Sequence, residues 1–188
     1  MMKKVLIAED YDIVIKGLQS IFDEHFKNYK LVKVKNNMNI VAALKEEEFE
    51  YAIIDIKLEE GSVMEILPTI FKNYPTISVL IFSAAAEEIY GKRVLQLGAK
   101  GFLHKSASEA EIIRALNVFF KKQPYVSLNL GNLLLNDISK KQQSLSPFAL
   151  LSNREIEVMA HIMSGKSLKE IAKIMNISHR TVEGYVLD

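Results

Sequence analysis

Between residues 3 and 121 the chain alternates five times between a short apolar run and a helical period, and this alternation restricts the fold more than any other feature. Strands are expected at 3–8, 30–34, 51–54, 77–82 and 101–103. Apolar, β-branched runs are typical of strands buried on both faces. Strand and helix in alternation imply a parallel sheet covered by helices on both faces, with right-handed crossovers. We therefore predict an α/β fold with a five-stranded, doubly wound parallel sheet.

The helical periods between these strands carry apolar faces and start signals. The first period places Ile13, Val14, Gly17, Leu18, Ile21 and Phe22 on one face. Further helices are expected at about 39–47, 63–72 and 87–97. The last helix opens at Ser108, three residues before Glu111, which is the spacing of a capping box, and runs to about residue 121.

The chain changes character after residue 122. Residues 123–150 are expected to form a linker with a short helix near 126–138, because 139–147 is polar and has no period. From 151 to 188 the period is purely helical, with capping boxes at Ser152 and Ser167, a helix end at Gly165 and a tight turn at Asn176. Two short helices joined by such a turn indicate a helix-turn-helix. The predicted domains are therefore 1–122, the 123–150 linker, and a small all-α domain at 151–188.

Composition excludes several classes of protein. The formal net charge is +1 and there is no cysteine, so thiolate metal sites, disulfides and cysteine nucleophiles are excluded. The apolar run near the N-terminus is too short for a signal peptide, and no run approaches the 18 or so apolar residues of a membrane span. We expect a cytoplasmic protein with no membrane partner.

Acidic side chains follow two of the expected strands. Glu9 and Asp10 follow the first strand, and Asp55 follows the third. The carboxyl ends of such strands are where ligands gather in open α/β sheets, and three carboxylates at one rim favour a hard cation such as Mg²⁺. Ser83 and Lys105 follow the fourth and fifth strands, and together they suit a phosphoryl group, which accepts from a hydroxyl and pairs with an ammonium.

These residues lie in segments that resemble the receiver domains of bacterial two-component response regulators. The matching segments are VLIAED at 5–10, IID at 53–55, LIFSA at 80–84 and GAKGFLHK at 98–105. The resemblance implies a flavodoxin-like fold and phosphorylation of Asp55 by a sensor histidine kinase. It further implies Mg²⁺ held by Glu9, Asp10, Asp55 and the Lys57 carbonyl, with Ser83 and Lys105 on the phosphoryl oxygens. Phe102 would be the aromatic switch residue.

The C-terminal region resembles a LuxR-type helix-turn-helix. The matches are LSNRE at 151–155, KEIA at 169–172 and ISHRTV at 177–182, so the whole chain is similar to response regulators of the LuxR/NarL type. Candidate DNA contacts are Lys166, Lys169, His179, Arg180, Thr181 and Glu183. The five basic and five acidic residues at 152–188 balance, so tight binding as a monomer is not expected.

Three departures from the family pattern matter. Glu9 stands where the family usually has aspartate, and Glu59 stands where it often has proline. The chain also stops at Asp188, inside the reading helix, so the LuxR-type domain is expected to be truncated, with residues after Val182 frayed and DNA binding weak.

The resulting hypothesis is a non-enzymatic transcription regulator that is phosphorylated on Asp55, dimerises when phosphorylated and binds promoter DNA. One alternative keeps the phosphorylated receiver as a protein-interaction module that no longer binds DNA. A second alternative is an enzyme of the haloacid-dehalogenase type with Asp55 as nucleophile. Such enzymes generally need an aspartate two residues later, where this chain has Lys57.

Overall fold

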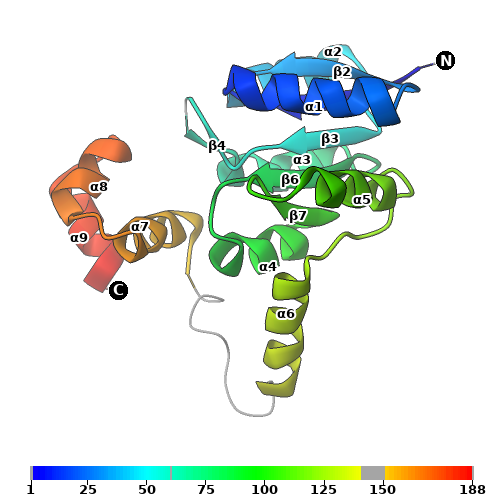
Figure 1. The fold of residues 1–188 in the computed structure, drawn as a ribbon. Helices are drawn as coiled ribbons and strands as arrows, with labels where there is room; N and C mark the ends of the chain where they lie inside the picture. The colour runs from blue at the N-terminus through cyan, green and yellow to red at the C-terminus, as the bar shows by residue number, and fades with distance from the viewer. Residues whose placement is uncertain (1, 60, 141–150, 188) are drawn as a thin grey trace. The chain divides into compact units, whose positions relative to one another are not determined.

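The computed structural model describes residues 2–59, 61–140 and 151–187. The chain forms two compact units, Met1–Leu133 and Leu134–Asp188 (Figure 1). Each unit has its own apolar core. Within the described residues, no helix combines the length and the apolar character that a membrane crossing requires.

The first unit is built on a five-stranded sheet in the order β2-β1-β3-β6-β7, and every neighbouring pair of strands is parallel. The strands are β1 (Lys3–Ala8), β2 (Tyr29–Val34), β3 (Tyr51–Ile54), β6 (Ser78–Ser83) and β7 (Gly101–His104). All residues of β3 and β6 are buried, as expected for strands with helices on both sides. The predicted doubly wound parallel sheet is therefore confirmed.

Five helices cover this sheet. They are α1 (Asp12–His25), α2 (Asn37–Glu46), α3 (Leu67–Asn73), α4 (Glu87–Leu97) and α5 (Glu109–Phe119). α1 and α5 lie on one face and α2 and α3 on the other (Figure 1). The larger core cluster joins the α1–α5 face to the sheet through residues such as Ile7, Phe22 and Phe119.

Three local details differ from the sequence prediction. A two-stranded antiparallel hairpin, β4 (Lys57–Leu58) and β5 (Gly61–Ser62), follows Asp55 and was not expected. The third helix is split into a 3₁₀ turn, η1 (Val63–Glu65), and α3, because Pro68 lacks an N–H and suits a helix start. Ile13 was placed on the buried face of α1 but is 75% exposed, and Ile15 is buried in its place.

The predicted short helix after the first domain is present as α6 (Leu128–Lys140). Its beginning belongs to the first unit, which extends to Leu133. The remainder of the predicted linker, residues 141–150, lies outside the described residues.

The second unit contains α7 (Asn153–Met163), α8 (Leu168–Ile174) and α9 (His179–Leu187), packed around Val158, Ile171, Ala172 and Val182. Both predicted capping boxes are confirmed, since Ser152 and Ser167 each exchange hydrogen bonds with the glutamate three residues later. Gly165 (φ 79°) and Asn176 (φ 52°) adopt the left-handed conformation expected of a helix end and a tight turn.

The expected fraying after Val182 was wrong. α9 remains helical to Leu187. Ser178 caps its first turn by accepting from the Thr181 N–H (3.0 Å), and Tyr185 packs against the small core. These contacts hold a helix that would be marginal in isolation.

Candidate functional site

The sheet order brings the predicted polar side chains to one rim. β1 and β3 are neighbours at the point where the strand order reverses, which is where open α/β sheets bind ligands. Glu9 and Asp10 follow β1, Asp55 follows β3, Ser83 ends β6, and Lys105 follows β7. The five predicted side chains, which come from the ends of four strands, therefore meet at the carboxyl edge of the sheet.

Three of these side chains form an acidic cluster. One carboxylate oxygen each from Glu9, Asp10 and Asp55 lies within 4.8 Å of the others. Glu9 is 2% exposed and Asp55 is 5% exposed. Asp10 Oδ1 is buried and has no hydrogen-bond partner within the described part of the chain. Three carboxylate oxygens that repel one another, with Asp10 Oδ1 buried and lacking a donor, fit a hard divalent cation.

Lys105 supplies the positive charge in this cluster. Its Nζ lies 2.6 Å from Glu9 Oε2 and 2.6 Å from Asp55 Oδ2, and only 14% of the side chain is exposed. Burial opposes the charged form, but hydrogen bonds to Asp55 and Glu9 outweigh it and raise the pKa of Lys105. The ammonium therefore stays charged and bridges two carboxylates.

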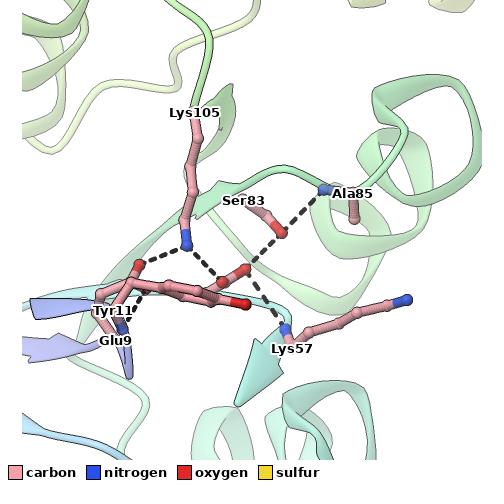
Figure 2. A network of polar contacts seen from close by, with 7 residues as sticks. Glu9, Tyr11, Lys57, Ser83, Ala85 and Lys105 are labelled. Atoms are coloured by element: carbon pink, nitrogen blue, oxygen red, sulfur yellow. Dashed lines mark hydrogen bonds and ion pairs between the residues drawn. The ribbon is translucent and has the colours of Figure 1, made fainter. Parts of the chain in front are cut away.

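Asp55 is the centre of the polar network. Ser83 Oγ donates to Asp55 Oδ1 at 2.5 Å, the Lys57 N–H approaches the same oxygen at 3.4 Å, and Lys105 binds the other oxygen. In Figure 2 the dashed lines from Ser83, Lys57 and Lys105 converge on this one carboxylate. Ser83 Oγ also accepts the Ala85 N–H at 3.2 Å, so the hydroxyl is oriented from both sides.

Glu9 contacts Lys105 through a side chain that is one methylene longer than the aspartate usual at this position in receiver domains. Burial raises the pKa of Glu9, although Lys105 and the Tyr11 N–H, which donates to Glu9 Oε1 at 3.1 Å, act in the opposite direction. A buried carboxyl of this kind binds most strongly to a full positive charge, either an ammonium or a metal ion.

Tyr11 belongs to the site and was missed by the sequence reasoning. Its ring lies 5.5 Å from Lys105 Nζ, although the residue is 62% exposed. Tyr11 also lines a cavity of about 620 Å³ together with Asp10, Val14, Asp55, Lys57, Leu58, Ser83, Ala84, Ala85 and Lys105. Its position directly after the two acids was the available signal, because the residue that starts α1 must lie beside them.

Phe102, the predicted switch residue, lies apart from this cavity lining. It is fully buried in β7, and strand alternation directs it to the face opposite its neighbour Leu103, which belongs to the α1–α5 core.

The predicted DNA contacts all fall in the second unit. Lys166 and Lys169 flank the start of α8, while His179, Arg180, Thr181 and Glu183 lie in the first turns of α9. Arg180, Thr181 and Glu183 are exposed. His179 Nδ1 lies 3.4 Å from Glu183 Oε1, and Thr181 Oγ1 lies 2.7 Å from Ser178 Oγ.

Comparison with known families identifies the class of protein. The response regulator receiver domain profile matches residues 5–117, and the profile of the bacterial regulatory proteins of the luxR family matches residues 149–187. The chain therefore belongs to the response regulator family. It is a response regulator with a receiver domain followed by a LuxR-type DNA-binding domain.

Individual relatives match nearly the whole of the chain. The chain is 26% identical to response regulator GacA of Pseudomonas syringae, over 98% of this chain and 86% of that protein. It is 26% identical to the oxygen regulatory protein NreC of Staphylococcus epidermidis, over 97% of this chain and 87% of that protein. A solved RcsB–DNA complex matches with a TM-score of 0.65 at 21% identity, covering 98% of this chain and 88% of that one. RcsB from Salmonella enterica serovar Typhimurium, bound to promoter rprA with a phosphomimetic, matches with a TM-score of 0.67 at 21% identity, covering 98% and 89%.

Proposed function

We propose that Asp55 accepts a phosphoryl group from the phosphohistidine of a sensor histidine kinase. The main support is that Ser83, Lys105 and the Lys57 N–H all contact the buried Asp55 carboxylate. The same carboxylate lines an open cavity. An Asp55 oxygen attacks phosphorus and the P–N bond breaks as the P–O bond forms. The imidazole leaves as the neutral ring because its other nitrogen already carries a proton. The reaction modifies the regulator once and is not a catalytic cycle.

Glu9, Asp10 and Asp55, with the Lys57 carbonyl, are the groups that would hold Mg²⁺. The unpartnered Asp10 Oδ1 and the close approach of the three carboxylates support this assignment. Bound Mg²⁺ would neutralise negative charge shared between the carboxylate and the incoming phosphoryl group. Lys105 contributes a second positive charge at the same place, directed from β7.

Ser83 and Lys105 are proposed to bind the phosphoryl oxygens after transfer. Both already contact Asp55, so each needs only to exchange a carboxylate oxygen for a phosphoryl oxygen. We propose that Phe102, which is fully buried, is the switch residue whose position changes when Ser83 and Lys105 bind the phosphoryl oxygens. Phosphorylation then shifts an equilibrium between two receiver conformations rather than creating a new fold.

The output is proposed to be transcription control through promoter DNA, with phosphorylation favouring a homodimer. Lys166, Lys169, His179, Arg180, Thr181 and Glu183 are the proposed DNA contacts. The complex of RcsB with promoter rprA and a phosphomimetic supports the pairing of phosphorylation with DNA binding in a protein of the same fold. A regulator of chromosomal promoters would act in the cytoplasm.

Intact-mass measurement after treatment with acetyl phosphate tests the assignment. We expect one added phosphoryl group with Mg²⁺, none with a chelator, and none on an Asp55→Asn chain. Asp23→Asn, an exposed aspartate of α1 that binds Gln19, is the matched control and should be labelled normally. Equal labelling of the Asp55→Asn chain would refute the assignment.

A further inference from the structure

The segment that joins the receiver core to α6 is bound to the receiver at two places, which we call the edge anchor and the latch. The edge anchor is Tyr125, which is 5% exposed. Its N–H donates to the Lys100 carbonyl at 2.7 Å, it pairs with Gly101 as a parallel bridge, and its hydroxyl donates to Glu111 Oε1 at 2.8 Å. A side chain at Gly101 would clash, because a Cβ would lie 2.5 Å from the Tyr125 carbonyl oxygen.

The latch joins the first turn of α6 to α4. Ser127 Oγ lies 2.8 Å from both carboxylate oxygens of Glu87, and Asn129 Nδ2 donates to Glu87 Oε2 at 3.3 Å and to Glu88 Oε1 at 2.9 Å. Glu87 is only 8% exposed, so it depends on these donors. The same Ser127 oxygen accepts the Leu130 N–H at 3.0 Å, so the cap of α6 and the bond to α4 share one atom.

The latch also includes a closely packed apolar contact between Leu130 of α6 and Gly91 of α4. Leu130 is 0% exposed, and a Cβ added at Gly91 of α4 would lie 2.9 Å from Leu130 Cδ1. Leu128, two residues earlier on the same helix, is 85% exposed. The start of α6 therefore packs on α4 through Leu130, and this contact requires glycine at position 91. Figure 1 shows α6 beginning beside α4.

The chain connects the latch directly to the site at Asp55. Ser83, which donates to Asp55, is four residues before Glu87, and the intervening turn is tied back to the Ser83 oxygen by the Ala85 N–H. α4 starts at Glu87 without a side-chain cap, so the turn at 84–86 sets the position of that carboxylate. The Ser83 hydroxyl has a single proton, and it can serve either Asp55 Oδ1 or a phosphoryl oxygen.

From these contacts we propose that the latch holds α6 on α4 while Asp55 is unmodified and opens when Asp55 is phosphorylated. The inference rests on the proposed function. When the Ser83 hydroxyl redirects its hydrogen bond from Asp55 Oδ1 to a phosphoryl oxygen, the 84–86 turn is displaced, and with it the first turn of α4. Leu130 packs too closely against Gly91 to tolerate that displacement, so Ser127 and Leu130 separate from α4. The edge anchor at Tyr125 stays in place, and release begins after it.

Thiol accessibility in the full chain tests the latch directly, because the protein has no cysteine of its own. A Leu130→Cys chain places a small apolar thiol at the buried seat. We expect its reaction with a maleimide to quicken at least tenfold when acetyl phosphate and Mg²⁺ phosphorylate the chain. A Leu128→Cys chain should react quickly in both states, and a Leu116→Cys chain, in the α5 core, slowly in both. Amide hydrogen exchange of residues 127–133 in the unsubstituted chain gives the same comparison without a thiol.

A steric clash introduced at position 91 gives a second test of the contact between α4 and α6. In a chain that keeps Leu130, Gly91→Val should quicken amide hydrogen exchange of residues 127–133 without phosphorylation, whereas Gly17→Val, an identical change in α1 with nothing within 4 Å, should not. A phosphorylated chain in which reaction and exchange are unchanged would overturn the coupling. Fast reaction of Leu130→Cys before phosphorylation, matching Leu128→Cys, would overturn the latch itself. A chain that gains no phosphoryl mass would reject the proposed function together with the coupling, so the two failures are distinguishable.

Discussion

The Lys105 ammonium bridges two carboxylates, Glu9 and Asp55, that are almost entirely removed from water. Each carboxylate would be costly to bury without a positive charge beside it. In the absence of a divalent ion, Lys105 therefore stabilises the receiver, in addition to its proposed role of binding the phosphoryl group. Sequence position alone suggested only the second role.

Lys105→Ala should lower the free energy of unfolding of the first unit by about 3 kcal/mol in chelator, because two buried carboxylates lose their cation. Millimolar Mg²⁺ should recover most of this loss, since it neutralises the same oxygens. Denaturant titration with and without Mg²⁺ checks both statements. Lys72→Ala, an exposed lysine of α3, is the control, and it should be unaffected by either condition. Equal stability of the Lys105→Ala and Lys72→Ala chains in chelator would show that the ion pair does not stabilise the fold.

Tyr11 partly covers the same charges from the solvent side. Tyr11→Ala should shorten the lifetime of the phosphorylated chain several-fold, because removal of the ring opens the cavity beside Asp55 and Lys105 to water. Tyr11→Phe retains the ring and its attraction for the ammonium, and should behave as the unsubstituted chain does. The decay of phosphorylated mass after removal of acetyl phosphate gives both lifetimes. Indistinguishable decay of the Ala and Phe chains would contradict a covering role.

Among the elements, those with local signals were predicted closely. Strands β1 and β3 and helix α4 have the predicted bounds, and both C-terminal capping boxes form as expected. Apolar periodicity and caps act over a few residues, so they can be read from the sequence. Ser108 also caps α5 as predicted, but Glu111 accepts from Tyr125 across the unit.

Elements that depend on distant partners were not predicted. The β4–β5 hairpin consists of two short strands with no apolar alternation. The attachment of residues 125–130 depends on Gly91 and Gly101, whose missing side chains matter only because Leu130 and Tyr125 lie against them. The acidic site was predictable because parallel strands bring residues after their carboxyl ends to one rim. Tyr11 required knowledge of where α1 begins relative to Lys105.

Helix α8 depends on its capping box. Ser167→Ala should cost the second unit about 1 kcal/mol at neutral pH, which is roughly a fivefold increase in amide exchange over 168–187. A hydrogen bond from the Ser167 side chain lowers the pKa of Glu170 from its ordinary 4.5. Its contribution is present above pH 4.5 and is lost as the pH falls through the lowered pKa. The difference between the two chains should therefore shrink in acid, and a difference that persists unchanged there would show that the ionised glutamate is not involved.

At the scale of the whole molecule, the chain separates a chemical site in one unit from candidate DNA contacts in another. The contacts in the second unit combine cations at the starts of α8 and α9 with an acid, Glu183, that lies beside His179. Because acids and bases balance there, DNA affinity must come from the placement of a few cations on one surface rather than from net charge.

Salt dependence on a short duplex of arbitrary sequence tests that placement, because non-specific binding is governed by phosphate neutralisation. Lys169→Ala and Arg180→Ala should each reduce the slope of log affinity against log salt by about one, which is the expected loss for one phosphate contact. Lys121→Ala, an exposed lysine of the first unit, should leave the slope unchanged. Fluorescence anisotropy of the labelled duplex at several salt concentrations, with the chain phosphorylated by acetyl phosphate, gives the slopes. Unaltered slopes in both variants would remove α8 and α9 from the DNA interface and leave the receiver as a protein-interaction module.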